Sequence, residues 1–309
     1  MKEINCNICE ERKHSKLFLL NDLYTNKDNK TEFQIVRCMG CGLVYIDPQP
    51  SYEELSPFYQ SGYFDELNKK DASQKKIYLF LKKVRKKLIP RFRVKFFNWN
   101  IGERSLPLKF LDVGCATGAN VASFMDDFPA WEFWGVEPDT QAAQKALFIK
   151  RLKVFNGSLK DAKYQDDYFD VILFHHVLEH VADPAADLKE SFRILKKKGK
   201  IIIAVPNHRS FMSQLFGKYW RHLDIPRHLF HFNKENLTAL LEKSGFRVKR
   251  VGHEILRGSI ISSLCARFDI SADFNNTPMN IFYFIMIPFN KLFESLGFGG
   301  AIYILAEKE

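Results

Sequence analysis

The pattern of apolar and polar residues divides this chain into strands and helices that alternate from residue 106 onward. Short runs that are apolar throughout, or that alternate with polar residues, predict strands, and apolar residues at helical spacing predict helices between them. The predicted strands are 110–113, 131–137, 153–156, 171–174, 200–206, 246–252 and 301–306, and the predicted helices are 140–150, 183–197 and 234–244. This alternation is typical of an α/β fold with a doubly wound parallel sheet. Asp183 and Pro184 are expected to begin the second helix, and Gly199 to end it.

Changes in composition divide the chain into three predicted parts. Residues 1–50 carry four of the six cysteines, residues 51–104 form an aromatic and basic helical linker or lid, and residues 105–309 form the α/β domain. Two insertions in this domain, 207–232 and 255–300, are expected to carry substrate specificity, because ligands bind at the carboxyl edge of such sheets.

A glycine turn follows the first predicted strand of the α/β domain. Gly114 and Gly118 are spaced for a nucleotide-binding junction, where a side chain would collide with a ligand and where the turn can require positive φ. The middle glycine of G-x-G-x-x-G, which lets backbone approach a pyrophosphate, is absent. Asp112 instead offers a carboxylate for a cationic group, and Glu137 at the end of the next strand can accept both ribose hydroxyls. This pair suits S-adenosylmethionine, which has a cationic head, a ribose and no phosphate.

The segment LDVGCATG at 111–118, followed by GVEPD at 135–139, resembles motif I and the acidic second strand of class I S-adenosylmethionine-dependent methyltransferases. The resemblance implies a Rossmann-like sheet of seven strands with the last strand antiparallel. It also places Ser158 beside the adenine, although Ser158 would serve equally as a simple helix cap. The cofactor-binding residues expected from these motifs are Asp112, Gly114, Cys115, Gly118, Glu137, Ser158 and His175.

The fourth predicted strand runs into the sequence H-H-V-L-E-H, which resembles the loop of this family that passes the sulfonium of the cofactor. His175 is therefore expected to line the cofactor pocket. A metal at the two adjacent histidines is not expected, since consecutive side chains point apart. Glu179 and His180 are expected to hold the shape of the loop by hydrogen bonds, with a catalytic role as the alternative.

Four cysteines form two C-x-x-C pairs, Cys6 with Cys9 and Cys38 with Cys41. In a reducing compartment, two such pairs about 28 residues apart are typical of a tetrahedral four-cysteine zinc site rather than of disulfides. A module of about 45 residues has too small a core to hold itself together, so the zinc is expected to be structural.

The amino-terminal region, with CxxCGLVY, then P-x-P and a tyrosine-rich stretch, resembles a bacterial methyltransferase group that includes sugar- and polysaccharide-tailoring enzymes. The segment P-R-H-L-x-H-F at 226–232 resembles the same group, whose sugar C-methyltransferases carry an E-H pair with the histidine as base. This resemblance implies that His228 is the catalytic base. Arg227 stands where the glutamate would be, and its guanidinium could instead hold a phosphate or carboxylate of the substrate.

Positive charge gathers in the linker, where residues 66–98 hold twelve Lys or Arg and two Asp or Glu, against a net charge of +10 for the whole chain. Apolar residues at helical spacing up to Pro90 predict an amphipathic helix with a basic outer face. Three roles are open for this face: a solvated surface, an RNA contact, or a contact with anionic lipid or an acidic substrate.

These features predict an S-adenosylmethionine-dependent methyltransferase with a small-molecule acceptor, foremost a sugar or nucleotide-linked sugar of polysaccharide or secondary metabolism. Two alternatives are an RNA methyltransferase that uses the zinc module and the basic helix, and a non-catalytic zinc-binding interaction protein. The polar start of the chain and the lack of an apolar run of about 18 residues predict a cytoplasmic location. The apolar segment 281–289 is expected to form a core or dimer helix, with an interfacial membrane contact as the alternative. The methylated atom and the oligomeric state stay open.

Overall fold

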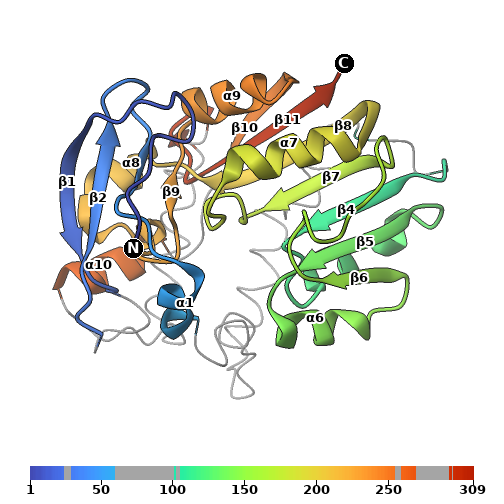
Figure 1. Ribbon diagram of the computed structural model, residues 1–309, viewed down its shortest axis with the longest axis horizontal. Helices are drawn as coiled ribbons and strands as arrows, with labels where there is room; N and C mark the ends of the chain where they lie inside the picture. Colours follow the sequence, from blue (N-terminus) through green and yellow to red (C-terminus); the bar gives the residue numbers. More distant parts are fainter. Residues whose placement is uncertain (24–28, 60–100, 102–104, 255–258, 269–291, 294) are drawn as a thin grey trace.

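The computed structural model describes residues 1–309 apart from 24–28, 60–100, 102–104, 255–258, 269–291 and 294 (Figure 1). The predicted basic helix in 66–98 and the apolar segment 281–289 fall outside the described residues, so the expectations about them stay predictions. None of the described helices is both long enough and apolar enough to cross a membrane.

A seven-stranded sheet forms the centre of the larger part of the molecule (Figure 1). Its strands are β4 (Lys109–Val113), β5 (Glu132–Glu137), β6 (Leu152–Asn156), β7 (Phe169–His175), β8 (Leu195–Pro206), β10 (Phe246–Glu254) and β11 (Ala301–Lys308). They follow the order β10-β11-β8-β7-β4-β5-β6, and β11 is antiparallel to both of its neighbours while the pairs from β8 to β6 are parallel. This arrangement confirms the predicted Rossmann-like methyltransferase sheet with its antiparallel last strand.

Both faces of this sheet are covered. Leu111 and Val113 of β4 belong to one buried apolar cluster, whereas Phe110, which precedes Leu111 in the strand, belongs to another. Successive side chains of a strand point to opposite faces, so each cluster marks one face. Burial on both faces explains why the central strands read as continuous apolar runs.

Helices and short helical turns connect the strands. The α-helices are α1 (Tyr52–Leu55), α5 (Ala119–Ala122), α6 (Thr140–Leu147), α7 (Pro184–Ile194), α8 (Phe211–Phe216), α9 (Lys234–Lys243) and α10 (Ser259–Phe268), and the 3₁₀ helices are η1 (Ser56–Phe58), η2 (Met125–Asp127), η3 (Gly217–Tyr219) and η4 (Arg221–Leu223). After the glycine turn that follows β4, the chain forms only the single turn of α5 and then η2.

Helix α7 begins as predicted but ends earlier. Asp183 caps it by accepting a hydrogen bond from the N–H of Ala186 at 3.0 Å, and Pro184 is the first helical residue. The prediction that Gly199 ends the helix is wrong, because α7 ends at Ile194 and β8 already includes Gly199. Lys308 of β11 explains the early end: its ammonium donates to the carbonyls of Phe192 and Leu195, both at 2.7 Å, and so takes over the acceptors that another turn of helix would have used.

A second sheet joins the amino-terminal residues to the insertion 207–232. Its strands β1 (His14–Leu20), β2 (Phe33–Cys38), β3 (Val44–Ile46) and β9 (Phe230–His231) follow that order. In Figure 1 the blue amino-terminal strands and the orange β9 lie on one side of the large sheet. The segment that carries His228 is thus hydrogen-bonded into the same sheet as the amino-terminal strands.

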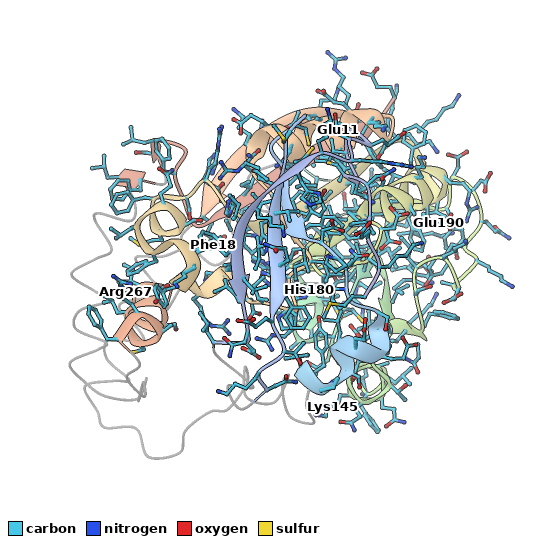
Figure 2. All side chains as sticks on the ribbon, turned by 60° about the vertical axis from the view of Figure 1, so that its left-hand side comes forward. Glu11, Phe18, Lys145, His180, Glu190 and Arg267 are labelled. Carbon is cyan, nitrogen blue, oxygen red and sulfur yellow. The ribbon has the colours of Figure 1, made fainter. Side chains whose placement is uncertain are left out.

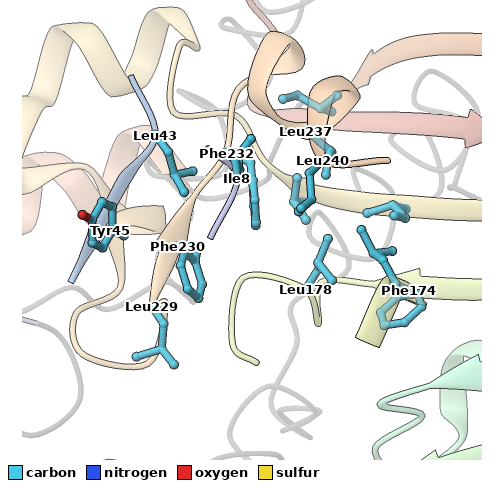
Figure 3. Packing of buried hydrophobic residues seen from close by; sticks show 14 of the residues in the cluster. Ile8, Leu43, Tyr45, Phe174, Leu178, Leu229, Phe230, Phe232, Leu237 and Leu240 are labelled. Carbon is cyan, nitrogen blue, oxygen red and sulfur yellow. The ribbon is translucent and has the colours of Figure 1, made fainter. Parts of the chain in front are cut away.

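One apolar core runs across the boundary between the two sheets. Figure 3 shows Ile8 and Leu43 from the amino-terminal residues together with Phe230, while Leu178 and Leu240 complete the same cluster from the large sheet's side. Each of these five side chains is at least 95% buried. The amino-terminal residues are therefore packed as part of the same core as the α/β domain.

Candidate functional site

The glycine turn lies at the carboxyl end of β4 and is built by its own backbone. The N–H groups of Gly114 and Cys115 donate to the carbonyl of Val136 at 2.8 and 3.0 Å. Gly114 has φ of 66° and Gly118 has φ of 72°, which confirms the expected left-handed conformation. A Cβ on Gly114 would lie 2.5 Å from Cγ2 of Val177. Close packing by the β7 loop therefore excludes a side chain here, in addition to any ligand.

Asp112 and Glu137 lie at the carboxyl ends of the neighbouring strands β4 and β5, and they are 2% and 5% exposed. Burial, followed by the nearby charge of Glu137, raises the pKa of Asp112 to about 8. The carboxylate of Glu137 accepts hydrogen bonds from the N–H groups of Ala116 at 2.8 Å and Asp139 at 2.9 Å. These two bonds fix the carboxylate against the turn, and its other lone pairs remain for a pair of hydroxyls.

The other predicted cofactor residues, Cys115, His175 and Ser158, differ in burial and in local bonding. Cys115 is buried, and its sulfur would lie 2.6 Å from a Cβ on Gly135, so the two positions pack as a small pair. His175 ends β7, and burial lowers its pKa to about 3, which makes it a neutral side chain. Ser158 is exposed, and its hydroxyl bonds the carboxylate of Asp161 at 2.5 Å and accepts from the Asp161 N–H at 3.2 Å. This is the bonding of a local cap, as the alternative for Ser158 anticipated.

The four cysteines of the two C-x-x-C pairs come together. The sulfur of Cys6 lies 3.4 Å from that of Cys41, the sulfur of Cys9 lies 3.4 Å from that of Cys38, and all four sulfurs are within 4.8 Å of one another. None of these cysteines forms a disulfide. Tetrahedral zinc with bonds of about 2.3 Å separates its sulfur ligands by about 3.8 Å, so the four-sulfur arrangement fits such an ion.

The structure encloses Arg227 in a buried ion-pair network rather than exposing it to a substrate. Its side chain is 0% exposed. The guanidinium donates to Asp22 at 2.8 and 3.2 Å, to Asp224 at 2.7 Å, and to the carbonyl of Phe58 at 3.3 Å. Two carboxylates already compensate its charge, so this geometry favours a role in holding three segments together over direct contact with an anionic substrate.

His228 is held in one orientation beside this network. Its Nδ1 lies 2.9 Å from the carbonyl of His222, and since a carbonyl only accepts, Nδ1 carries the hydrogen and Nε2 has the free lone pair. Burial and the neighbouring His180 lower the pKa of His228 to about 4, so the ring is neutral at neutral pH. A neutral imidazole with a directed Nε2 lone pair has the form that a general base requires.

Two further residues contact this site. The rings of His180 and His228 are 4.6 Å apart, edge to face, and Figure 2 labels His180 near the centre of the molecule. Nδ1 of His180 lies 3.0 Å from the carbonyl of Arg227 and 3.2 Å from the hydroxyl of Tyr59. From the sequence, His180 is expected only to hold the shape of its loop, and Tyr59 is noted only as part of a tyrosine-rich stretch. The hydrogen bond between them joins residues 121 positions apart, which no local sequence pattern can indicate.

A protein-family model described as "Methyltransferase domain" matches residues 75–251, which is more than half of the 309 residues. A probable S-adenosylmethionine-dependent methyltransferase of Mycolicibacterium smegmatis is 31% identical over 144 residues, or 45% of this chain and 52% of that protein. A 2-methyl-6-phytyl-1,4-hydroquinone methyltransferase of Oryza sativa is 25% identical over 158 residues, or 49% of this chain and 46% of that protein. The chain thus spans about half the length of these curated relatives.

Solved structures share the fold at low sequence identity. A putative sarcosine dimethylglycine methyltransferase from Galdieria sulphuraria aligns with a TM-score of 0.50 at 16% identity, covering 74% of this chain and 86% of that one. A complex of the Haloferax volcanii Trm112 methyltransferase activator with a putative methyltransferase gives a TM-score of 0.50 at 16% identity, covering 69% of this chain and 87% of that one. At this identity the likeness concerns the fold.

Proposed function

The chain belongs to the methyltransferase domain family, and we propose that it is an S-adenosylmethionine-dependent methyltransferase whose acceptor is a sugar-containing small molecule. One observation carries the acceptor proposal: the predicted base His228 is only 7% exposed and lies in a segment bonded to the amino-terminal sheet. A nearly enclosed base suits a small acceptor. The sugar class itself rests on the resemblance of the amino-terminal region and of 226–232 to sugar-tailoring enzymes.

The donor is proposed to bind around the glycine turn. Asp112 would hold the amino group, Glu137 the ribose hydroxyls and His175 the wall beside the sulfonium, while Gly114, Cys115 and Gly118 leave room for the ligand. Ser158 is proposed to contact the adenine of the cofactor. Its hydroxyl is already bonded to Asp161, so its backbone as well as this hydroxyl could make the contact. When bound, S-adenosylmethionine supplies an electrophilic methyl carbon, and the protein has to align a nucleophile with it.

His228 is proposed to remove the acceptor's proton at Nε2. Arg227 would act indirectly, by holding the residues around His228 in place. Its carbonyl accepts a hydrogen bond from His180, and its guanidinium forms ion pairs with Asp22 and with Asp224, which begins the turn that holds His228. An Arg227 that contacted the substrate directly would have to leave these two ion pairs.

The four cysteines are proposed to hold structural zinc. The metal would fix two cysteine knuckles: the first, Cys6–Cys9, precedes β1, and the second, Cys38–Cys41, lies between β2 and β3. Its contribution would therefore be to the folding of the amino-terminal sheet. We further propose the boundaries 1–50 and 51–104 for the zinc module and the linker, and 105–309 for the catalytic domain with its insertions 207–232 and 255–300.

Two experiments test this function. Calorimetry with S-adenosylmethionine should show binding that is lost in Asp112→Ala and in Glu137→Ala, whereas undiminished binding in both variants would remove the proposed donor site. A screen of nucleotide sugars for uptake of a labelled methyl group should give an acceptor whose methylation depends on His228. Methylation of RNA but of no sugar in that screen would transfer the assignment to an RNA methyltransferase.

A further inference from the structure

Three side chains that can bind a proton or a cation converge next to the proposed acceptor site. They are Glu179, His180 and His228, and their nearest ligand-type atoms all lie within 4.8 Å of one another. Glu179 is 1% exposed and His228 is 7% exposed. The first two follow β7 in the H-H-V-L-E-H loop, and His228 comes from the segment before β9.

Among the described residues, the neighbouring carboxylates of Asp22 and Asp224 are paired with guanidinium groups, whereas Glu179 is not. Asp22 and Asp224 are paired with the two guanidinium groups of Arg221 and Arg227. Glu179 has no Lys or Arg within ion-pair distance among the described residues, and its nearest partner is Nδ1 of His176 at 3.3 Å. Within the same described part of the chain, its second oxygen, Oε2, is buried without a hydrogen-bond partner. A buried carboxylate in this condition favours a positive charge beside it.

The backbone of Glu179 also holds the segment that carries the base. Its carbonyl accepts from the N–H of Leu229 at 2.8 Å and from that of Phe230 at 3.2 Å. Glu179, whose carboxylate lacks a Lys or Arg partner among the described residues, therefore also fixes the position of the His228 segment relative to the loop after β7.

We propose that Glu179 is a positioning residue whose carboxylate supplies the counter-charge for the proton that His228 takes from the acceptor. The step balances as follows: the bond between hydrogen and the acceptor atom breaks, the proton goes to Nε2 of His228, the acceptor atom bonds the methyl carbon, and the electron pair of the broken carbon–sulfur bond stays on sulfur. The positive charge of the sulfonium thus reappears on the imidazole, where Glu179 stabilises it. Glu179 would stabilise the protonated imidazole of His228 as the buried aspartate stabilises the protonated histidine in the catalytic triads of hydrolases.

Asp224 is a second carboxylate that faces His228, with its Oδ2 3.8 Å from Nε2. Its charge is already paired with Arg221 and Arg227, whose guanidinium groups both bond its Oδ1, whereas the charge of Glu179 has no such partner among the described residues. His222 offers only its carbonyl, to Nδ1. The other polar side chains around the cluster, His180, His176, His231 and Tyr59, are not carboxylates and so bring no negative counter-charge.

The test uses the full chain labelled with ¹⁵N-histidine and needs no acceptor. This proposal rests on the proposed function, since it takes His228 as the base, but the two can fail separately: a chain that methylates no sugar can still show coupling between Glu179 and His228.

The Nε2 signal of His228 is followed from pH 8 to pH 5, with circular dichroism as the check on folding. In the wild type we expect the Nδ1–H tautomer and the beginning of protonation toward pH 5.

Glu179→Gln should reduce that change of the Nε2 signal at least 5-fold, and Glu179→Asp, which keeps the charge, should retain it. Asp170→Asn, which removes a carboxylate at the far end of β7, is the matched control and should leave it unchanged. With an acceptor from the screen, Glu179→Gln should also lower kcat about 10- to 100-fold and move the acidic limb of the pH profile to lower pH, with little change in KM. If Glu179→Gln does not fold, the His228 titration is compared between Glu179→Asp and the wild type alone, and the two should agree because the charge is kept.

Two results would overturn the proposal. One is a His228 titration that is the same in wild type and Glu179→Gln, which would leave Glu179 a purely structural part of the loop. The other is a bound metal ion, beyond any held by the cysteines, that is lost in His228→Ala, because the cluster would then be a metal site instead of a proton site.

Discussion

At the scale of a single residue, the buried carboxyl of Asp112 destabilises the fold at the position where we propose that it binds the cofactor. Its carboxyl has an ordinary pKa of 3.8 and a folded-state pKa of about 8, raised by burial and then by Glu137. The folded state therefore binds this proton more tightly than the unfolded state does, and the free energy of unfolding falls as the pH rises from about 4 to about 8. A cationic ligand group would reverse this penalty by pairing with the carboxylate.

Asp112→Asn should therefore stabilise the free protein while weakening the binding of S-adenosylmethionine. We expect a gain of roughly 1–3 kcal/mol at pH 8 and a smaller one at pH 5, since asparagine carries no charge to desolvate. Denaturant titrations at the two pH values measure this, and calorimetry should show affinity reduced at least about 10-fold, equivalent to 1.4 kcal/mol. Equal stabilities of variant and wild type at pH 8 would contradict the assigned pKa. In wild type, binding at pH 7 should also release protons into the buffer.

Gly114 carries a second prediction at the same scale. Gly114→Ala would place a methyl group 2.5 Å from Val177 on a residue with φ of 66°, so we expect a loss of about 2–4 kcal/mol from overpacking and backbone strain together. Adding Val177→Ala should recover the overpacking part and leave about 1 kcal/mol of strain. Urea unfolding of the two variants and of Val177→Ala alone gives the comparison. If the second substitution recovers nothing, the β7 loop is not what excludes the side chain.

At the scale of elements, the sequence predicts what is local and misses what is paired over distance. Each strand of the large sheet lies within a few residues of its apolar run, because burial on both faces leaves a strong local pattern. The end of α7 predicted from Gly199 is wrong. The group that bonds the carbonyls at the helix end, the ammonium of Lys308, is more than a hundred residues away in the sequence. The two-residue β9 is too short for periodicity to mark, and its pairing with β3 depends on tertiary contacts.

Lys308 allows a test of the helix end. Lys308→Met keeps the length of the side chain and removes its donors, which leaves the carbonyls of Phe192 and Leu195 without this partner. We expect a loss of about 2–3 kcal/mol, because buried acceptors lose a charge-assisted hydrogen bond. The matched control is Lys249→Met on β10, whose ion pair with Glu307 at 3.4 Å lies at the surface and should be worth less than about 1 kcal/mol. Equal losses in the two variants would argue against the capping role. Neither variant should change the affinity for S-adenosylmethionine.

At the scale of the whole molecule, the candidate site is assembled from three distant parts of the chain. The proposed donor side could be identified from the sequence, since Asp112, the glycine turn and Glu137 lie within 30 residues and resemble a known motif. On the proposed acceptor side, the sequence indicates only Arg227 and His228 and none of their distant partners. Arg227 is bonded to Asp22 across 205 positions and His180 to Tyr59 across 121, and such partners are found only when the chain is folded.

This assembly predicts that the cysteine cluster controls the acceptor side and leaves the donor side intact. β3 follows Cys41 directly, and the N–H of Ile46 in β3 donates to the carbonyl of Leu229 at 3.0 Å, next to His228. If zinc holds the knuckles, its removal should loosen β3 and with it the segment around His228. The glycine turn is anchored instead to β5, through the carbonyl of Val136.

Hydrogen exchange of the full chain before and after chelation measures this prediction, with Cys38→Ser as a genetic equivalent. The Ile46 amide should exchange at least about 10-fold faster after zinc loss, a change of 1.4 kcal/mol in local opening, while the Gly114 amide and the affinity for S-adenosylmethionine stay as they were. Cys265→Ser, which removes a cysteine outside the cluster, should change neither amide. A chain that contains no zinc, or one whose two amides lose protection together, would show that the acceptor segment does not depend on the cysteine cluster in this way. In the second case the two sheets would open as one cooperative unit, as their shared core around Phe230 and Leu240 permits.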